Sequence, residues 1–131
     1  MEKNVLSLLT LKKDVAYLQD DFTLRQAIEK MEAHSYSVIP VIDHESGKYL
    51  YSLSEGSILY YLKDRRIAWD DTNKIPLPEV HPRRDTLAVS VREPFDTVAG
   101  LIIHQNYVPI VDDNGIFIGI VTRKSVLKEI I

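Results

Sequence analysis

The stretch Ile39-Pro-Val-Ile-Asp43 decides the fold, because the chain returns to it once, as Val108-Pro-Ile-Val-Asp112. Both copies are short apolar runs rich in β-branched residues, which is typical of a buried strand, and the proline in each favours a sheet edge or the start of a strand. A turn with one glycine and a second apolar run follow each copy. The prolines lie 69 residues apart and the glycines, Gly47 and Gly115, lie 68 apart, so the two registers differ by one turn residue. We interpret the chain as an internal duplication.

Helical and strand patterns surround both copies in the same order. After Thr23, apolar residues recur at helical spacing, and Thr23 and Gln26 have the spacing of a capping box. The first half is predicted to form a short amphipathic helix at 5–11, a strand at 15–18, a helix at 23–34, strands at 38–42 and 48–53, and a helix at 54–63. The second half is predicted to form a strand at 87–91, a helix at 96–103, a strand at 108–111, and a further strand that ends at a helix beginning with Thr122. Each half is therefore a β-α-β-β-α unit.

This pattern predicts an α/β (α+β) fold in which two such motifs pack about a pseudo-twofold axis. One unit of about 60 residues leaves a sheet face bare, whereas two units cover each other and create a cleft that is a natural ligand site. We expect residues 1–131 to form a single module, with the first motif at 12–64, a linker at 65–85 and the second motif at 86–131. Three prolines and mixed charges between Asp70 and Arg84 indicate the linker.

Composition narrows the class of protein. With 131 residues, 45% of them hydrophobic, the chain has room for one compact domain with a sizeable core. A net charge of −3 and a pI near 5.8 argue against non-specific binding of nucleic acid. The absence of cysteine removes disulfides and thiolate chemistry and fits a reducing compartment. No apolar run approaches the roughly 18 residues that a membrane-spanning helix needs, so we expect a cytoplasmic protein.

An anion site is predicted at Gly119–Leu127, where an apolar strand runs into Thr122, Arg123 and Lys124 and then into helical spacing. Thr122 fits equally as the N-cap of the helix and as a ligand contact. The free N–H groups of the first turn, the helix dipole and two cations all favour a phosphate, whereas purely solvated cations there would oppose the dipole. The first half has Glu55 at the place of Arg123, so we expect one anion-competent site per chain and a weak or empty equivalent in the first motif.

With these segments the chain resembles proteins built from CBS motifs. The two proline-containing strands and Gly119-Ile-Val-Thr122 are similar to the signature segments of that family, and the chain from about Val15 onward looks like one CBS pair, or Bateman module. The resemblance implies that adenosine-containing ligands bind in clefts between the repeats, and that the chain associates into a homodimer.

A narrower resemblance is to the stand-alone CBS pairs that bind cyclic di-AMP, the CbpB/DarB group. It rests on Val15-Ala-Tyr-Leu-Gln19, Ser35-Tyr-Ser-Val-Ile-Pro40 and Thr122-Arg-Lys-Ser-Val-Leu-Lys-Glu129. It implies that backbone and apolar groups of the first two segments hold adenine and ribose, and that the cations of the third meet the phosphates. The implied ligand-binding residues are Val15, Ala16, Leu18, Tyr36, Ser37, Val38, Ile39, Pro40, Phe117, Gly119, Thr122, Arg123 and Lys124.

Four positions bear on this assignment. Many mononucleotide-binding CBS motifs have an aspartate three residues after the threonine that accepts bonds from both ribose hydroxyls, whereas here Ser57 and Ser125 stand at that place. A ligand with a free 2′,3′-diol loses this partner, while cyclic di-AMP, whose 3′-oxygens are tied into phosphodiesters, needs it less. Asp14 departs from the group, which can offer a lysine there, although lysines at 12 and 13 are adjacent. Tyr36 fits equally as a ring that stacks on a base and as part of the core.

No glycine-rich phosphate loop or nucleophile elbow is present, and the histidines lack metal-ligand spacing, so we expect neither an enzyme nor a resident cofactor or metal. His44 and the pair Asp20-Asp21 are interpreted as solvated surface residues. The leading hypothesis is a signal-transduction module in which cyclic di-AMP occupancy controls a partner protein. The resemblance implies that such partners include the (p)ppGpp synthetase/hydrolase, contacted by the ligand-free form. The alternatives are an AMP, ADP or ATP energy sensor and a structural dimerisation module without a ligand.

Overall fold

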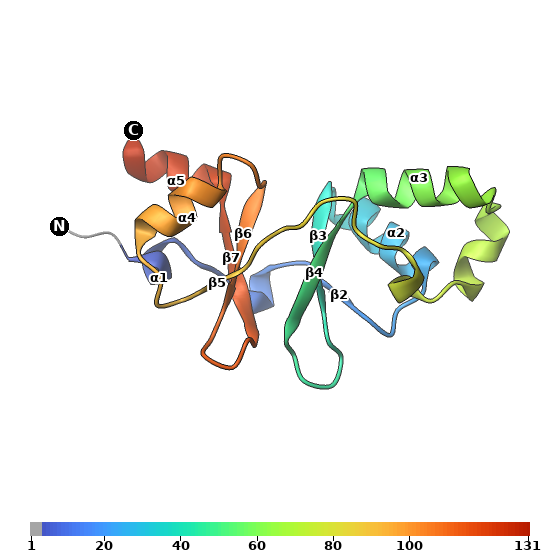
Figure 1. Ribbon diagram of the computed structural model, residues 1–131, viewed down its shortest axis with the longest axis horizontal. Helices are drawn as coiled ribbons and strands as arrows, with labels where there is room; N and C mark the ends of the chain where they lie inside the picture. Colours follow the sequence, from blue (N-terminus) through green and yellow to red (C-terminus); the bar gives the residue numbers. More distant parts are fainter. Residues whose placement is uncertain (1–3) are drawn as a thin grey trace. The chain divides into compact units, whose positions relative to one another are not determined.

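The computed structural model describes residues 4–131, which form two compact units (Figure 1). The repeat-1 unit contains Ala16–Ser46 and Leu50–Asp85, and the repeat-2 unit contains residues 4–15, Gly47–Tyr49 and Thr86–Ile131. In the described part of the chain, no helix has the length and apolar character needed to cross a membrane.

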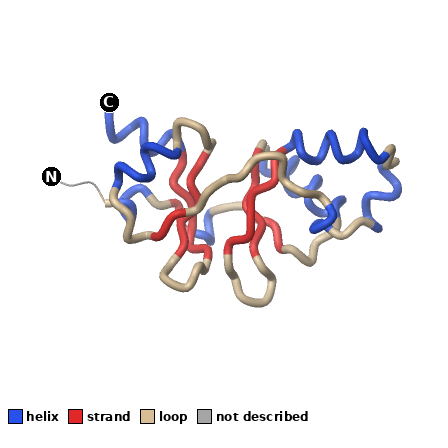
Figure 2. The backbone as a smooth tube through the Cα atoms, in the orientation of Figure 1, coloured by secondary structure: helices blue, strands red, loops and turns tan. Residues whose placement is uncertain are grey.

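The repeat-1 unit is a small sheet with helices on one of its faces (Figure 2). Its elements are β2 (Leu18–Gln19), α2 (Leu24–His34), β3 (Val38–Ile42), β4 (Tyr49–Ser54) and α3 (Glu55–Arg65), followed by 3₁₀ turns at Trp69–Lys74 and Leu77–Glu79. The strand order is β2-β3-β4, and β2 runs parallel to β3. Thr23 and Gln26 form the predicted capping box at the start of α2. Apolar side chains from both helices and the sheet form one core, which includes Leu18, Leu24, Met31, Ile39, Leu53 and Ile58.

The repeat-2 unit contains a four-stranded sheet. Its elements are α1 (Val5–Leu8), β1 (Thr10–Leu11), a 3₁₀ turn at Lys12–Asp14, β5 (Val89–Ser90), α4 (Phe95–Leu101), β6 (Tyr107–Val111), β7 (Phe117–Thr122) and α5 (Arg123–Ile130). The strand order is β1-β7-β6-β5, with β7 antiparallel to both neighbours and β5 parallel to β6. Its core includes Val98, Val108, Ile110, Val121 and Val126.

The predicted duplication is confirmed, because each unit contains β-α-β-β-α in the expected order. Equivalent residues of the two repeats also pair with each other inside the repeat-2 unit, where Lys48 forms an antiparallel bridge with Ile116. The amide of Tyr49 donates to the carbonyl of Gly115, and the amide of Phe117 donates to the carbonyl of Gly47, at 3.2 and 3.0 Å. The two turns that carry the repeated glycines are therefore joined by a symmetric pair of backbone bonds.

The expectation that each proline marks a sheet edge or a strand start is wrong. Pro40 and Pro109 lie in the middle of β3 and β6, which are inner strands. The parallel neighbours β2 and β5 have only two residues each and pair opposite Val41 and Ile110, one residue past the prolines. Because no strand faces the prolines on that side, their missing N–H groups remove no ladder bond there.

The segment expected as one amphipathic helix at 5–11 is a helix only from Val5 to Leu8. Thr10 and Leu11 form strand β1, which pairs with Ile120 and Gly119 of β7. An open strand edge offers backbone partners that a helix of this length cannot supply for itself, because a single helical turn is marginal in water.

Candidate functional site

Both repeats begin their last helix with the same hydroxyl cap. The Thr122 hydroxyl accepts a hydrogen bond from the Ser125 amide at 3.1 Å and lies 2.9 Å from the Ser125 hydroxyl. Ser54 and Ser57 repeat this arrangement at the start of α3 with the same two distances. Both hydroxyls therefore satisfy N–H groups that the first helical turn leaves without a partner. A contact between Thr122 and a ligand stays a prediction.

The side chain of Arg123 closes the end of the neighbouring helix α4. Its Nε donates to the carbonyl of Ile102 at 3.2 Å, and its Nη2 donates to the carbonyl of Gln105 at 2.9 Å. Ile102 is the C-cap of α4, so the guanidinium satisfies a carbonyl at the helix end and places a positive charge near the negative end of the helix dipole, while its bond to Gln105 holds the loop that follows. Because a guanidinium has five N–H donors, these bonds use only part of its capacity.

Lys124 is a positive charge at the start of α5 that the fold itself does not use. The side chain is exposed, the first turn of α5 holds no acidic residue, and Lys124 has no hydrogen bond or ion pair within the part of the chain that the structure describes. A cation in the first turn of a helix opposes the helix dipole. In α3 the first turn instead carries Glu55, whose charge favours the dipole. The two helix starts thus share their cap and differ in charge.

Gly119 and Phe117, both implied as ligand contacts, hold structural positions in β7. Phe117 is 1% exposed and stacks on Tyr49, with the ring centroids 6.3 Å apart. Gly119 lies opposite Leu11, and a Cβ atom there would lie 2.2 Å from the carbonyl oxygen of Thr10. The lysines at 12 and 13 follow Leu11. Because β1 is antiparallel to β7, they lie toward the start of β7 and away from its C-terminal end.

Most of the other implied contacts lie in the repeat-1 unit, and Tyr36 connects two of their segments. Its hydroxyl accepts a hydrogen bond from the Ala16 amide at 3.3 Å, and its ring is half-buried. The carbonyl of Ser37 accepts a hydrogen bond from the Glu55 amide at 2.9 Å, while the side chain of Ser37 is exposed and that of Val38 is half-buried. The remaining implied contacts are buried, with Val15 in the repeat-2 unit and Ala16, Leu18, Ile39 and Pro40 in the repeat-1 unit.

The repeat-1 unit also contains a pocket of about 740 Å³ between α2 and α3. Apolar and aromatic side chains form most of its lining, which consists of Ile28, Met31, Glu32, Ser35, Tyr36, Glu55, Gly56, Ile58, Leu59, Leu62 and Trp69. Tyr36 is the only implied ligand contact among these lining residues. A pocket of this volume falls in the range that small-molecule ligands occupy in proteins.

Residues 5–64 and 79–131 each match the family model for the CBS domain. The chain belongs to the CBS domain family. The two matched stretches begin at α1 and at the 3₁₀ turn Leu77–Glu79, so each CBS repeat includes a segment before its first strand. A comparison with curated proteins finds no match to this CBS pair.

Solved structures share the whole CBS-pair fold. CbpB from Listeria monocytogenes in complex with c-di-AMP has a TM-score of 0.85 and 26% identity, over 98% of this chain and 95% of that chain. A hypothetical conserved protein from Geobacillus kaustophilus has a TM-score of 0.86 and 28% identity, over 99% of this chain and 97% of that chain. CBSX2 in complex with AMP has a TM-score of 0.76 and 20% identity, over 97% and 95% of the two chains, which shows the fold alone.

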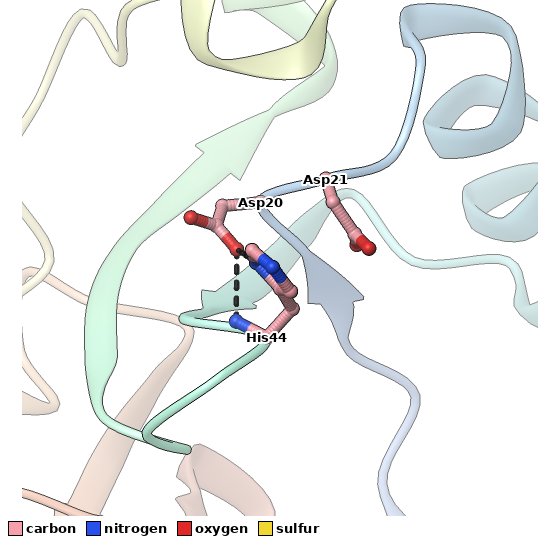
Figure 3. Close-up of side chains that lie close together, drawn as sticks. All are labelled: Asp20, Asp21 and His44. Atoms are coloured by element: carbon pink, nitrogen blue, oxygen red, sulfur yellow. Dashed lines mark hydrogen bonds and ion pairs between the residues drawn. The ribbon is translucent and has the colours of Figure 1, made fainter.

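The first CBS repeat brings together three polar side chains that sequence reasoning treated as separate. Asp20, Asp21 and His44 each place a potential ligand atom within 4.8 Å of the others (Figure 3). His44 Nδ1 lies 2.8 Å from Asp20 Oδ1, which also accepts a hydrogen bond from the His44 amide at 2.8 Å. An imidazole and two carboxylates are a donor set that divalent cations take, although here the Asp20–His44 bond already occupies two of the donors. Asp20 and His44 are 24 positions apart in the chain, which explains why the sequence pattern gave no sign of the cluster.

The same contact predicts that His44 titrates above its ordinary value. The hydrogen bond to Asp20 raises the pKa of His44 from 6.5, desolvation lowers it, and the charges of Asp21, Asp20 and Glu45 raise it further. Because the pKa is raised in the folded chain, the protonated ring stabilises the fold below about pH 6.5, and this contribution disappears as the pH rises through the folded-state pKa. We expect Asp20→Asn to lower the His44 pKa in an NMR titration, with His81 as an internal control. An unchanged His44 pKa in that variant would contradict the assignment.

Proposed function

We propose that this CBS pair is a regulatory nucleotide-binding protein that binds cyclic di-AMP and controls a partner protein according to ligand occupancy. The observation that carries the proposal is the uncompensated Lys124 at the capped start of α5. The fold gains nothing from a cation there, whereas an anionic ligand gains both the charge and the dipole. Arg123 adds its remaining donors beside Lys124 and keeps α4 closed at the same time.

The residue after the cap supports a dinucleotide over a mononucleotide. Ser125 stands where an aspartate would bind a ribose diol, and its hydroxyl is directed to Thr122 at 2.9 Å. CbpB from Listeria monocytogenes, whose complex contains c-di-AMP, has the same fold at 26% identity. We therefore propose that Thr122, Arg123 and Lys124 contact phosphate, and that Ala16, Leu18 and the segment 36–39 contact adenine and ribose. Val15, Pro40, Phe117 and Gly119 complete the proposed ligand contacts. No cofactor or metal is part of the proposal.

Calorimetric titration with cyclic di-AMP, AMP and ATP tests the ligand. We expect submicromolar binding of cyclic di-AMP, a loss of about tenfold or more in Lys124→Ala, and an unchanged melting temperature in that variant, because a charge-assisted phosphate contact contributes about 1.5–3 kcal/mol. Arg123→Ala is expected to lose affinity and also thermal stability, since it opens the end of α4. Lys63→Ala, which removes another exposed lysine outside the implied ligand contacts, is the matched control.

The opposite pattern would reject this assignment. Tight binding of AMP with no binding of cyclic di-AMP would favour an energy sensor, the alternative nucleotide-binding function. Absence of binding for all three nucleotides would favour a structural dimerisation module. Chromatography of the nucleotides recovered after titration tests the proposal that the chain is not an enzyme, because any consumed nucleotide would contradict it.

The regulated partner and the assembly are further parts of the proposal. We propose a cytoplasmic homodimer whose ligand-free form contacts another protein, with a (p)ppGpp synthetase/hydrolase as the candidate partner. A nucleotide controls such a contact only if it binds the partner-bound and the partner-free sensor with different affinities. Co-purification with that enzyme in the absence of cyclic di-AMP, and its loss on adding the nucleotide, is the expected result. Co-purification that ignores the nucleotide would contradict ligand control.

A further inference from the structure

Gln105 is a buried glutamine whose side chain binds the backbone of another segment. It is 9% exposed and lies between α4 and β6 in the repeat-2 unit. Its Oε1 accepts a hydrogen bond from the Leu87 amide at 2.9 Å, and its Nε2 donates to the Leu87 carbonyl at 3.1 Å. The same Nε2 donates to the Tyr107 carbonyl at 3.1 Å. Both N–H groups and the oxygen of the carboxamide are therefore in use.

Tyr36 is the equivalent of Gln105 in the repeat-1 unit, since each stands four residues before the proline of its repeat. The backbone groups that they bind correspond as well. Ala16 and Leu87 each stand two residues before the strand position that pairs one residue past that proline. In the repeat-1 unit the Tyr36 hydroxyl accepts a hydrogen bond from the Ala16 amide at 3.3 Å. The duplication thus repeats one contact with two different side chains.

The carboxamide of Gln105 presents to Leu87 the hydrogen-bond pattern of an adenine base. In both groups an acceptor atom stands beside an amino donor in one plane, namely oxygen beside nitrogen in glutamine and a ring nitrogen beside the N6 amino group in adenine. The backbone N–H and C=O groups of one residue complement this pair. The phenolic hydroxyl of Tyr36 has one oxygen and no amino group, so it does not reproduce the pattern.

We infer that Gln105 is a specificity-determining residue, whose carboxamide takes at Leu87 the place that the adenine of the ligand takes at Ala16. Each chain then recognises adenine through one backbone edge only. A base that entered at Leu87 would leave a buried carboxamide without partners, which costs more than displacing the Tyr36 hydroxyl. This inference rests on the proposed function, in which Ala16 contacts adenine, and adds the residue that excludes a base from the second repeat.

NMR titration of the ¹⁵N-labelled chain with adenosine tests the inference, because adenosine carries the base without a phosphate. In the unsubstituted chain we expect the Ala16 amide signal to shift and the Leu87 signal to stay. In Gln105→Ala and Gln105→Tyr, we expect the Leu87 signal to shift at adenosine concentrations within about tenfold of those that shift Ala16. Leu87 is 56% exposed, so a base can reach its backbone once the carboxamide is removed.

Two controls separate base recognition from changes in the fold. Inosine has a carbonyl oxygen in place of the N6 amino group and a protonated ring nitrogen beside it, so its donor and acceptor are reversed and it is expected to shift neither signal. Asn114→Ala removes an exposed carboxamide from the same unit and is expected to behave like the unsubstituted chain. A Leu87 signal that responds to adenosine without any substitution, or that stays in both folded Gln105 variants, would overturn the inference.

The reciprocal substitution in the repeat-1 unit does not depend on the folding of the Gln105 variants. Tyr36→Gln offers a carboxamide to the backbone of Ala16, and we expect it to weaken adenosine binding there by about tenfold or more. An unchanged affinity would overturn the inference. An Ala16 signal that ignores adenosine in the unsubstituted chain would contradict the base contact of the proposed function, whereas the Leu87 signal in the Gln105 variants decides the inference separately.

Discussion

Gly119→Ala is expected to destabilise the repeat-2 unit by about 3 kcal/mol or to prevent its folding, because overpacking against rigid backbone is among the costliest single substitutions. The added Cβ would lie 2.2 Å from the Thr10 carbonyl oxygen and 2.9 Å from a Leu9 methyl group. A side chain can move aside, but the Thr10 carbonyl belongs to strand β1, which pairs with β7 at this residue. Relief therefore requires β1 to separate from β7.

Two other glycines serve as controls for this substitution. Gly115→Ala meets no atom within 4 Å but has a φ of +81°, so it measures the cost of the left-handed backbone alone, about 1 kcal/mol. Gly100→Ala meets no atom within 4 Å and lies in α4, so it is expected to raise stability by about 0.5–1 kcal/mol. Urea unfolding followed by circular dichroism compares the three variants. A Gly119→Ala variant as stable as Gly115→Ala would refute the role of close packing.

The repeat could be predicted from the sequence because its signals are local. The strand pair around each proline, the capping box at Thr23 and the hydroxyl caps Ser54 and Thr122 all depend on residues within one turn or one hairpin of each other. Strand β1 gave no such signal. Two residues have no measurable period, and what makes them a strand is an edge of β7 that lies more than 100 positions away in the chain.

The candidate site shows the same limit. The sequence placed Thr122, Arg123 and Lys124 together at the start of a helix, and the structure places them there. It did not indicate that Arg123 closes α4, because the carbonyls of Ile102 and Gln105 come close to Arg123 only in the folded unit. Nor did it indicate the cluster of Asp20 and His44, which two separate loops form. Spacing in a sequence reports neighbours along one element and misses contacts between elements.

The segment between the repeats illustrates this limit in the core. Its three prolines and mixed charges predicted a linker, yet Leu77 and Val80 are fully buried in the core of the repeat-1 unit. Val5 and Leu8, which precede the first repeat, are likewise buried in the core of the repeat-2 unit. The two segments continue as Lys12-Lys13-Asp14 and Arg83-Arg84-Asp85, a similarity that the sequence does contain. Each core is therefore completed by the residues that precede the other repeat's first strand.

Leu77→Ala is accordingly expected to destabilise the repeat-1 unit by about 3 kcal/mol, as truncation of a fully buried leucine does when the cavity cannot collapse. Leu77 is fixed on both sides, since its amide donates to the Phe22 carbonyl at 2.9 Å and Pro76 forms a bridge with Thr23. Trp69 is the single tryptophan of the chain and belongs to the same unit, so its fluorescence during urea unfolding reports this unit directly.

The matched control is Leu87→Ala, which removes the same atoms from a side chain that is 56% exposed. It is expected to change the unfolding free energy by less than about 0.5 kcal/mol, because its side chain keeps much of its contact with water in the folded chain. Equal effects of the two substitutions would contradict the role of Leu77 in the first core. A large effect of Leu77→Ala alone means that a cut between the repeats removes part of the first core, so a fragment ending at residue 64 should fail to fold.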